Sequence, residues 1–215
     1  MQVAVIGANG GIGREVLPRL VDAGHDPIGV VRDESQFDAV RDRGGEPRLG
    51  DLEGEFASAF EGSDAVVFTA GSGGDTGWDK TLTVDLWGAR RSIDACVEHG
   101  IDRFVMISAY QASEPLAEPE ALRPYRVAKR CADDYLEWSP LDATILRPTT
   151  LTDEGGTGRI SAVFEYRGDG GADIPRADVA QTVVACLANE ETIGETIRLF
   201  GGDSPIEQAI RPDDG

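Results

Sequence analysis

Short apolar runs alternate with segments of helical periodicity, and this alternation constrains the fold more than any other feature of the chain. Runs rich in Val, Ile and Phe occupy residues 2–7, 26–32, 64–71, 102–108 and 141–148. Helical spacing of apolar residues marks 13–24, 34–44, 79–100 and 124–139. Near-continuous apolar strands are typical of a parallel sheet that is covered by helices on both faces. We therefore expect an α/β fold with a doubly wound parallel sheet.

The length of 215 residues fits a single domain. Residues 1–148 carry the regular alternation and form its core, while 149–215 form a smaller, dependent part. In this second part we expect strands at 161–166 and 196–200 and helices at 176–189 and 204–210. No apolar run reaches the roughly 18 residues of a membrane span, and the N-terminus lacks the features of a signal peptide. A cytoplasmic location is the expectation.

Acidic residues outnumber basic ones by 39 to 20, which gives a formal net charge of -19. Such a charge repels nucleic acids and anionic membranes, so we expect neither as a partner. Lysine occurs only at Lys80 and Lys129. An acid-rich, lysine-poor composition is typical of proteins from salt-loving organisms, and we favour this interpretation over a basic partner. The residues show no metal-site spacing, so no metal is predicted.

The segment GANGGIG follows the first strand directly and opens the first helix. Its glycines Gly7, Gly10 and Gly13 have the spacing expected where a dinucleotide's pyrophosphate meets a helix N-terminus. Glycine allows the sharp turn and the close approach, and the helix end supplies free N–H groups. The residues expected to contact the dinucleotide are Gly7, Asn9, Gly10, Gly11, Ile12 and Gly13. A tight turn without a ligand is the alternative.

The end of the second strand predicts which dinucleotide binds. An NAD site usually has an acid at this point, but here Val31 is followed by Arg32. An arginine suits a 2′-phosphate, because its guanidinium forks onto phosphate oxygens. We therefore expect NADP, with NAD possible because Asp33 comes next in the chain. Asp33 has a second interpretation as the cap of the following helix.

Taken together, GANGGIG, VVRD, LGDL, YRVAK and LDATILRP resemble the short-chain dehydrogenase/reductase superfamily. The closest resemblance is to its atypical branch, the NmrA-like and epimerase-like NAD(P)-binding proteins, and it extends over almost the whole chain. It implies a Rossmann-type sheet and a cofactor-binding core at 1–148. It also implies that Asp51 and Leu52 lie beside the adenine, that Ala70 and Gly71 pack along the cofactor, and that Pro148 lies near the nicotinamide.

Tyr125 and Lys129 are spaced i, i+4 and therefore share one face of the predicted helix at 124–139. In the superfamily that this chain resembles, the tyrosine exchanges a proton with the substrate oxygen. The lysine there holds the nicotinamide ribose, and its charge favours the phenolate. A chance match of this spacing is the alternative interpretation.

Ser108 ends the fifth strand, and the resemblance implies a catalytic role for it. Many relatives have a second serine here, but this chain has Ala109. Three functions follow. The first is NADP-dependent reduction of a small carbonyl, quinone or flavin-like substrate with Tyr125 as proton donor. The others are nucleotide-sugar epimerase or dehydratase chemistry and a non-catalytic NAD(P) redox sensor. The sequence does not indicate an oligomeric state.

Two further segments have features that bear on the substrate side of the site. The glycine-rich stretch 70–79 is interpreted as a mobile lid over the nicotinamide end, with Trp78 or Lys80 facing the substrate. Plain solvent exposure of these two side chains is the alternative. Arg176 and Asp178 are interpreted as a structural ion pair or a helix cap, in preference to substrate contacts.

Overall fold

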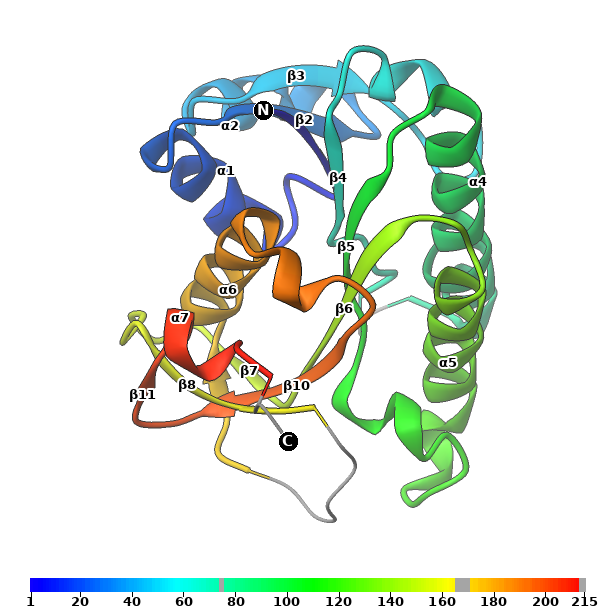
Figure 1. Ribbon diagram of the computed structural model, residues 1–215. Coiled ribbons are helices and arrows are strands. Elements are labelled where there is room, and N and C mark those ends of the chain that lie inside the picture. The colour runs from blue at the N-terminus through cyan, green and yellow to red at the C-terminus, as the bar shows by residue number, and fades with distance from the viewer. Residues whose placement is uncertain (74–75, 165–170, 213–215) are drawn as a thin grey trace.

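A computed structural model describes residues 1–73, 76–164 and 171–212 (Figure 1). Within these residues nine strands form one sheet in the order β11-β8-β10-β6-β5-β4-β1-β2-β3. They are β1 (Gln2–Ile6), β2 (Asp26–Val31), β3 (Glu46–Leu49), β4 (Ala65–Phe68), β5 (Arg103–Ile107), β6 (Asp142–Pro148), β8 (Arg159–Val163), β10 (Thr196–Gly201) and β11 (Ser204–Pro205). A separate pair joins β7 (Leu151–Thr152) to β9 (Ile174–Pro175).

Helices connect most of these strands. The α-helices are α1 (Gly13–Asp22), α2 (Phe37–Arg41), α3 (Trp78–Lys80), α4 (Ala89–His99), α5 (Arg123–Glu137), α6 (Arg176–Ala188) and α7 (Ile206–Ala209). A π-helical segment, η3 (Thr81–Gly88), joins α3 to α4. Short 3-10 turns are η1 (Glu34–Gln36), η2 (Ala57–Phe60), η4 (Tyr110–Ser113), η5 (Glu120–Leu122) and η6 (Glu190–Thr192).

The sheet is parallel from β3 through β10, and β8 and β11 add an antiparallel edge. The predicted doubly wound α/β fold is therefore confirmed. β8, β10 and β11 come from the second part of the chain and extend the sheet of the first part. β8 begins at Arg159 instead of residue 161, and residues 165 and 166 of the expected strand lie outside the described part.

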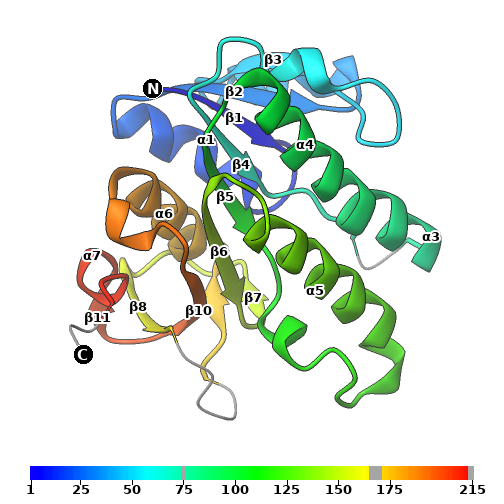
Figure 2. The same cartoon turned by 45° about the vertical axis from the view of Figure 1, so that its right-hand side comes forward.

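Helices cover both faces of the sheet (Figures 1 and 2), and a hydrophobic cluster lies on each face. On one face, Leu17 and Leu20 of α1 pack in one cluster with Val179 and Val183 of α6. On the other face, a second cluster combines residues of α4 and α5 with η2. Alternate residues of the central strands enter the two clusters, which explains why these strands are apolar throughout.

Among the described residues, no helix is both long enough and apolar enough to cross a membrane.

Candidate functional site

A crevice site is expected at the carboxyl edge of the sheet between β1 and β4, where the strand order reverses. Gly7 follows β1 and has φ +79°, a left-handed conformation that favours glycine. A Cβ on Gly7 would lie 2.8 Å from the Cα of Ala70, which follows β4. The loops after the two strands therefore touch at this point, and a larger residue at position 7 would push them apart.

The glycine loop turns tightly into α1. Gly10 N–H donates to the Gly7 carbonyl at 2.8 Å, and a Cβ on Gly13 would lie 2.4 Å from that same oxygen. Among the described hydrogen bonds, none is donated by the backbone N–H of Gly11 or Ile12. Free N–H groups at the start of a helix are the usual ligands of a phosphate group. The loop thus fits a pyrophosphate, while the Asn9 side chain accepts a bond from Arg14 at 2.9 Å.

Arg32 follows β2 directly and is exposed. The neighbouring Asp33 is the N-cap of η1 and accepts a hydrogen bond from the Ser35 N–H at 2.8 Å. Hydrogen bonding from Ser35 is also the main reason that the pKa of Asp33 lies below its usual value. The capping interpretation of Asp33 is therefore confirmed.

The predicted adenine-side residues lie after β3. Asp51 accepts a hydrogen bond from the Glu53 N–H at 2.9 Å, so its carboxylate shapes a turn. Leu52 is buried and lies close to Gly88, where an added Cβ would come within 3.0 Å of the leucine side chain.

Lys80 forms an ion pair with an acid that follows β3. Its ammonium contacts the Glu53 carboxylate at 2.6 Å, and Thr83 donates to the same carboxylate at 2.8 Å. Lys80 thus lies beside the segment predicted for the adenine side. Trp78 remains about half exposed. Residues 74 and 75 of the predicted lid lie outside the described part of the chain.

Tyr125 and Lys129 share one face of α5, and the Lys129 ammonium lies 5.9 Å from the centre of the Tyr125 ring. Lys129 is buried and bonds the Ile107 carbonyl at 3.2 Å. Its ammonium pairs with the buried carboxylate of Asp85 in η3 at 3.4 Å. Burial opposes the ammonium charge, but its interactions with Tyr125, Asp85 and Asp133 outweigh burial, so the pKa of Lys129 is raised.

Asp85 also connects this pair to the loop after β4. Its second carboxylate oxygen accepts a hydrogen bond from the Ser72 N–H at 3.0 Å, and a Cβ on Gly71 would lie 3.2 Å from its first oxygen. The carboxylate therefore holds the loop after β4 against α5. The π-helical turn that carries Asp85 belongs to a class that occurs frequently at functional sites.

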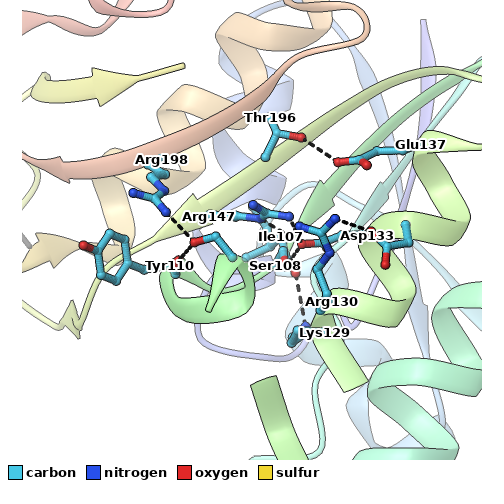
Figure 3. A network of polar contacts seen from close by, with 12 residues as sticks. Ile107, Ser108, Tyr110, Lys129, Arg130, Asp133, Glu137, Arg147, Thr196 and Arg198 are labelled. Carbon is cyan, nitrogen blue, oxygen red and sulfur yellow. Dashed lines mark hydrogen bonds and ion pairs between the residues drawn. The ribbon is translucent and has the colours of Figure 1, made fainter. Parts of the chain in front are cut away.

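The hydroxyl of Ser108 is engaged within the protein. It donates to the Asp133 carboxylate at 2.8 Å, and the same oxygen pairs with two guanidinium nitrogens of Arg147 at 2.8 and 2.9 Å (Figure 3). All three side chains are buried. Burial raises the pKa of the Asp133 carboxyl to about 6, against the opposing effects of Arg147, Ser108 and Lys129.

Sequence reasoning did not identify Asp133 or Arg147. The only sequence signal for Arg147 is a charge inside an apolar strand, and the only one for Asp133 is a charge on the buried side of a helix. Such a signal marks a position but does not indicate its partner. Pro148 follows Arg147, is buried and ends β6.

Arg176 and Asp178 do not pair with each other among the described contacts. Arg176 pairs with Asp153 at 2.7 Å, and the Asp178 carboxylate accepts backbone bonds from Thr157 and Gly158 at 2.8 to 3.0 Å. Asp178 therefore fixes the loop that follows β7. In the described residues, no group of three or more His, Cys, Asp or Glu side chains is placed to hold a metal ion.

The reversal of strand order, the glycine loop at the first strand and the helix that begins from it define a dinucleotide-binding protein of the Rossmann class. The chain belongs to the NAD(P)H-binding family, whose model matches residues 7–190. The resemblance to epimerase-like NAD(P)-binding proteins is thus confirmed. A nicotinamide dinucleotide is the cofactor that this family implies, and the crevice residues fit it.

The chain is similar to proteins that span nearly its whole length. It is 46% identical to YhfK of Bacillus subtilis, named an uncharacterized sugar epimerase, over 98% of this chain and 99% of that one. A solved structure from Bacillus halodurans carries the name NAD-dependent epimerase/dehydratase. It is 41% identical, covers 98% of both chains and has a TM-score of 0.95. The oxidoreductase ylbE from Lactococcus lactis is 28% identical, with a TM-score of 0.85 over 98% of this chain and 95% of that chain.

Proposed function

We propose that this protein is an NADP-dependent reductase of a small carbonyl, quinone or flavin-like substrate, with Tyr125 as its proton donor. The observation that carries the proposal is the Tyr125–Lys129–Asp85 cluster. A lysine that is nearly excluded from water keeps its charge against the ring of a half-buried tyrosine. The same cluster contacts the loop after β4, beside which the cofactor is expected to lie.

The chemistry requires one hydride and one proton. A reduced nicotinamide, when bound, would supply the hydride, to the carbonyl carbon of an aldehyde or ketone or to the electron-accepting ring of a quinone or flavin-like substrate. The Tyr125 hydroxyl gives its proton to the substrate oxygen, or to a ring nitrogen of a flavin-like substrate, and becomes a phenolate. The Lys129 ammonium stabilises that negative charge, because a nearby cation favours the ionised form. Asp85 and the Ile107 carbonyl hold the ammonium in place, so that it is already oriented when the proton leaves.

Preference for NADP rests on Arg32. Its guanidinium is exposed at the strand end where the adenine ribose is expected, and the acid beside it is used as a helix cap. Fluorescence titration with NADPH and NADH tests this assignment. We expect Arg32→Ala to weaken NADPH binding about 10-fold or more and to leave NADH binding within 2-fold. Equal losses for both dinucleotides would contradict the role of Arg32.

Tyr125→Phe tests the catalytic role. With carbonyl, quinone and flavin substrates screened for NADPH oxidation, we expect kcat to fall about 10²- to 10⁴-fold, because the proton donor is removed. The Kd for NADPH should stay within 2-fold. The matched control is Tyr135→Phe, whose hydroxyl donates to Asp94 of α4, and it should keep full activity. An activity that survives Tyr125→Phe undiminished would rule out the proton-donor role.

Epimerase chemistry is the second candidate, favoured by the names of the relatives from Bacillus subtilis and Bacillus halodurans. It would use the same tyrosine without net consumption of cofactor. Interconversion of nucleotide sugars in the presence of NAD, with no NADPH oxidation on the carbonyl panel, would favour it over the reductase.

A third candidate, a redox sensor, is favoured by Ala109 and by the Ser108 hydroxyl that Asp133 already engages. Dinucleotide binding without turnover of any substrate would favour the sensor.

A further inference from the structure

The side chain of Arg176 lies on the glycine loop. A Cβ on Gly11 would be 2.8 Å from the Nε of Arg176 and 3.0 Å from its Cδ, and the three heavy atoms nearest to that point all belong to Arg176. Arg176 is the first residue of α6, which packs beside α1 on one face of the sheet (Figures 1 and 2). The arrangement brings a guanidinium from residue 176 to a loop near the N-terminus of the chain.

Gly11 itself supports a role for this approach. Its φ lies outside the left-handed region, so the backbone does not require glycine there. Glycine at position 11 instead leaves room for the Arg176 side chain, which a Cβ at this position would contact at 2.8 Å. The neighbouring Gly13, by contrast, is needed because its own loop would collide with a side chain.

The ion pair that Arg176 forms with Asp153 is weak enough for a ligand to replace it. The Nη1 group donates to Asp153 at 2.7 Å, but the Asp153 side chain is 90% exposed whereas that of Arg176 is 29% exposed. Ion pairs with an exposed carboxylate contribute little to stability. A guanidinium has five N–H donors, and its fork matches phosphate oxygens better than a single contact to Asp153 does.

We infer that Arg176 is a cofactor-binding residue that covers the pyrophosphate from the side of α6, with Asp153 as its partner in the free protein. The inference rests on the proposed dinucleotide binding and adds a residue outside the glycine loop. The pyrophosphate lies between the free N–H groups of Gly11 and Ile12 and the guanidinium. On binding, phosphate oxygens replace the Asp153 carboxylate.

Equilibrium binding tests this directly, without turnover. The Kd values for NADPH, NADH and ADP-ribose are measured at one KCl concentration at which the wild type is folded. Arg176→Ala should weaken all three ligands by a similar factor of about 10 to 100, because all contain the pyrophosphate. Asp153→Asn should bind them at least as tightly as the wild type, since the competing carboxylate is gone. Arg41→Ala is the matched control, because Arg41 also forms an exposed pair, with Asp38 at 2.9 Å, and it should change nothing.

The outcomes separate this inference from the proposed function. If the wild type binds the dinucleotides and Arg176→Ala binds them within 2-fold of it, the inference is wrong and the proposed function stands. If Arg176→Ala fails to fold, the Asp153→Asn variant tests the inference in its place. Weaker dinucleotide binding by Asp153→Asn than by the wild type would show that phosphate does not replace Asp153 on Arg176, and the inference would be wrong. If the wild type binds no dinucleotide, the proposed function falls, and the inference with it.

Discussion

Four charged residues near the carboxyl edge of the sheet are buried in two opposite-sign pairs. Lys129 pairs with Asp85, and Arg147 pairs with Asp133, with exposed side-chain fractions between 0 and 6%. Charges of this kind persist inside a protein only with a partner, because desolvation of a lone charge costs several kcal/mol. The two pairs therefore fix the relative positions of α5, η3 and β6 around the expected site.

The Lys129–Asp85 pair can be tested by a double-mutant cycle. Lys129→Met leaves the Asp85 carboxylate buried without its cation, and Asp85→Asn leaves the ammonium without its carboxylate. Each single change should lower the free energy of unfolding by about 3–5 kcal/mol, and the double variant should lose clearly less than the sum. Urea unfolding measures the three differences. Losses that simply add would show that the two groups do not interact.

Asp133 predicts a pH dependence of stability. Its pKa of about 6 in the folded protein lies above the ordinary value of 3.8, so the folded state binds a proton more readily than the unfolded state between these values. The Asp133 contribution to the free energy of unfolding is therefore greatest at low pH and is lost as the pH rises through 6. The gap between the two pKa values corresponds to roughly 3 kcal/mol at most.

The test measures the free energy of unfolding of the wild type and of Asp133→Asn as a function of pH. The difference between the two proteins cancels the contribution of the other acids. The stability of the wild type relative to this variant should decrease between pH 4 and pH 6 and stay constant above pH 7. A relative stability that increases with pH over this range would mean that Arg147 dominates and holds the carboxyl ionised.

At the scale of elements, the tight glycine loop requires glycine at position 13 although alanine has the higher helix propensity. Gly13 is the first residue of α1, where alanine normally favours the helix by about 1 kcal/mol. Its Cβ would, however, lie 2.4 Å from the Gly7 carbonyl oxygen, a contact that forces the loop to move. Overpacking of this kind costs about 1–3 kcal/mol, so the collision exceeds the propensity gain.

Gly13→Ala should therefore lower the free energy of unfolding and weaken dinucleotide binding at least 10-fold, as measured by thermal unfolding and NADPH titration. The matched control is Gly155→Ala, because a Cβ there meets no atom within 4 Å and φ is not left-handed. That control should change the free energy of unfolding by less than about 0.5 kcal/mol. A binding loss in both variants would mean that the loop geometry is not the cause.

The helix predicted at 79–100 illustrates what element-level patterns miss. The structure has a helical run here, but its middle, η3, is π-helical and carries Asp85. The spacing of apolar residues indicates which face of a helix is buried. The π turn is a change of backbone hydrogen-bond register over a few residues, and this spacing does not reveal it. The existence of the helix was therefore predictable, and the segment that positions Asp85 was not.

For the molecule as a whole, the charge of -19 predicts that salt controls stability. Exposed acids repel one another, and salt at molar concentration reduces the screening length to about 3 Å. We expect the unfolding temperature to increase steadily as KCl is added up to molar concentrations, as measured by calorimetry. A stability that does not depend on salt would remove the interpretation of the acidity as salt adaptation.

The sequence by itself determined the features that depend on neighbours along the chain. These are the alternating strands and helices, the glycine loop after the first strand, Arg32 at the end of the second and the Tyr125–Lys129 spacing on one helix face. Only the tertiary structure decided the contacts between distant segments, which are Asp85 with Lys129, Ser108 with Asp133 and Arg147, and Arg176 with Gly11. The physical reason is that periodicity specifies which face of an element is buried, while the partner of a buried charge depends on how the elements pack against one another.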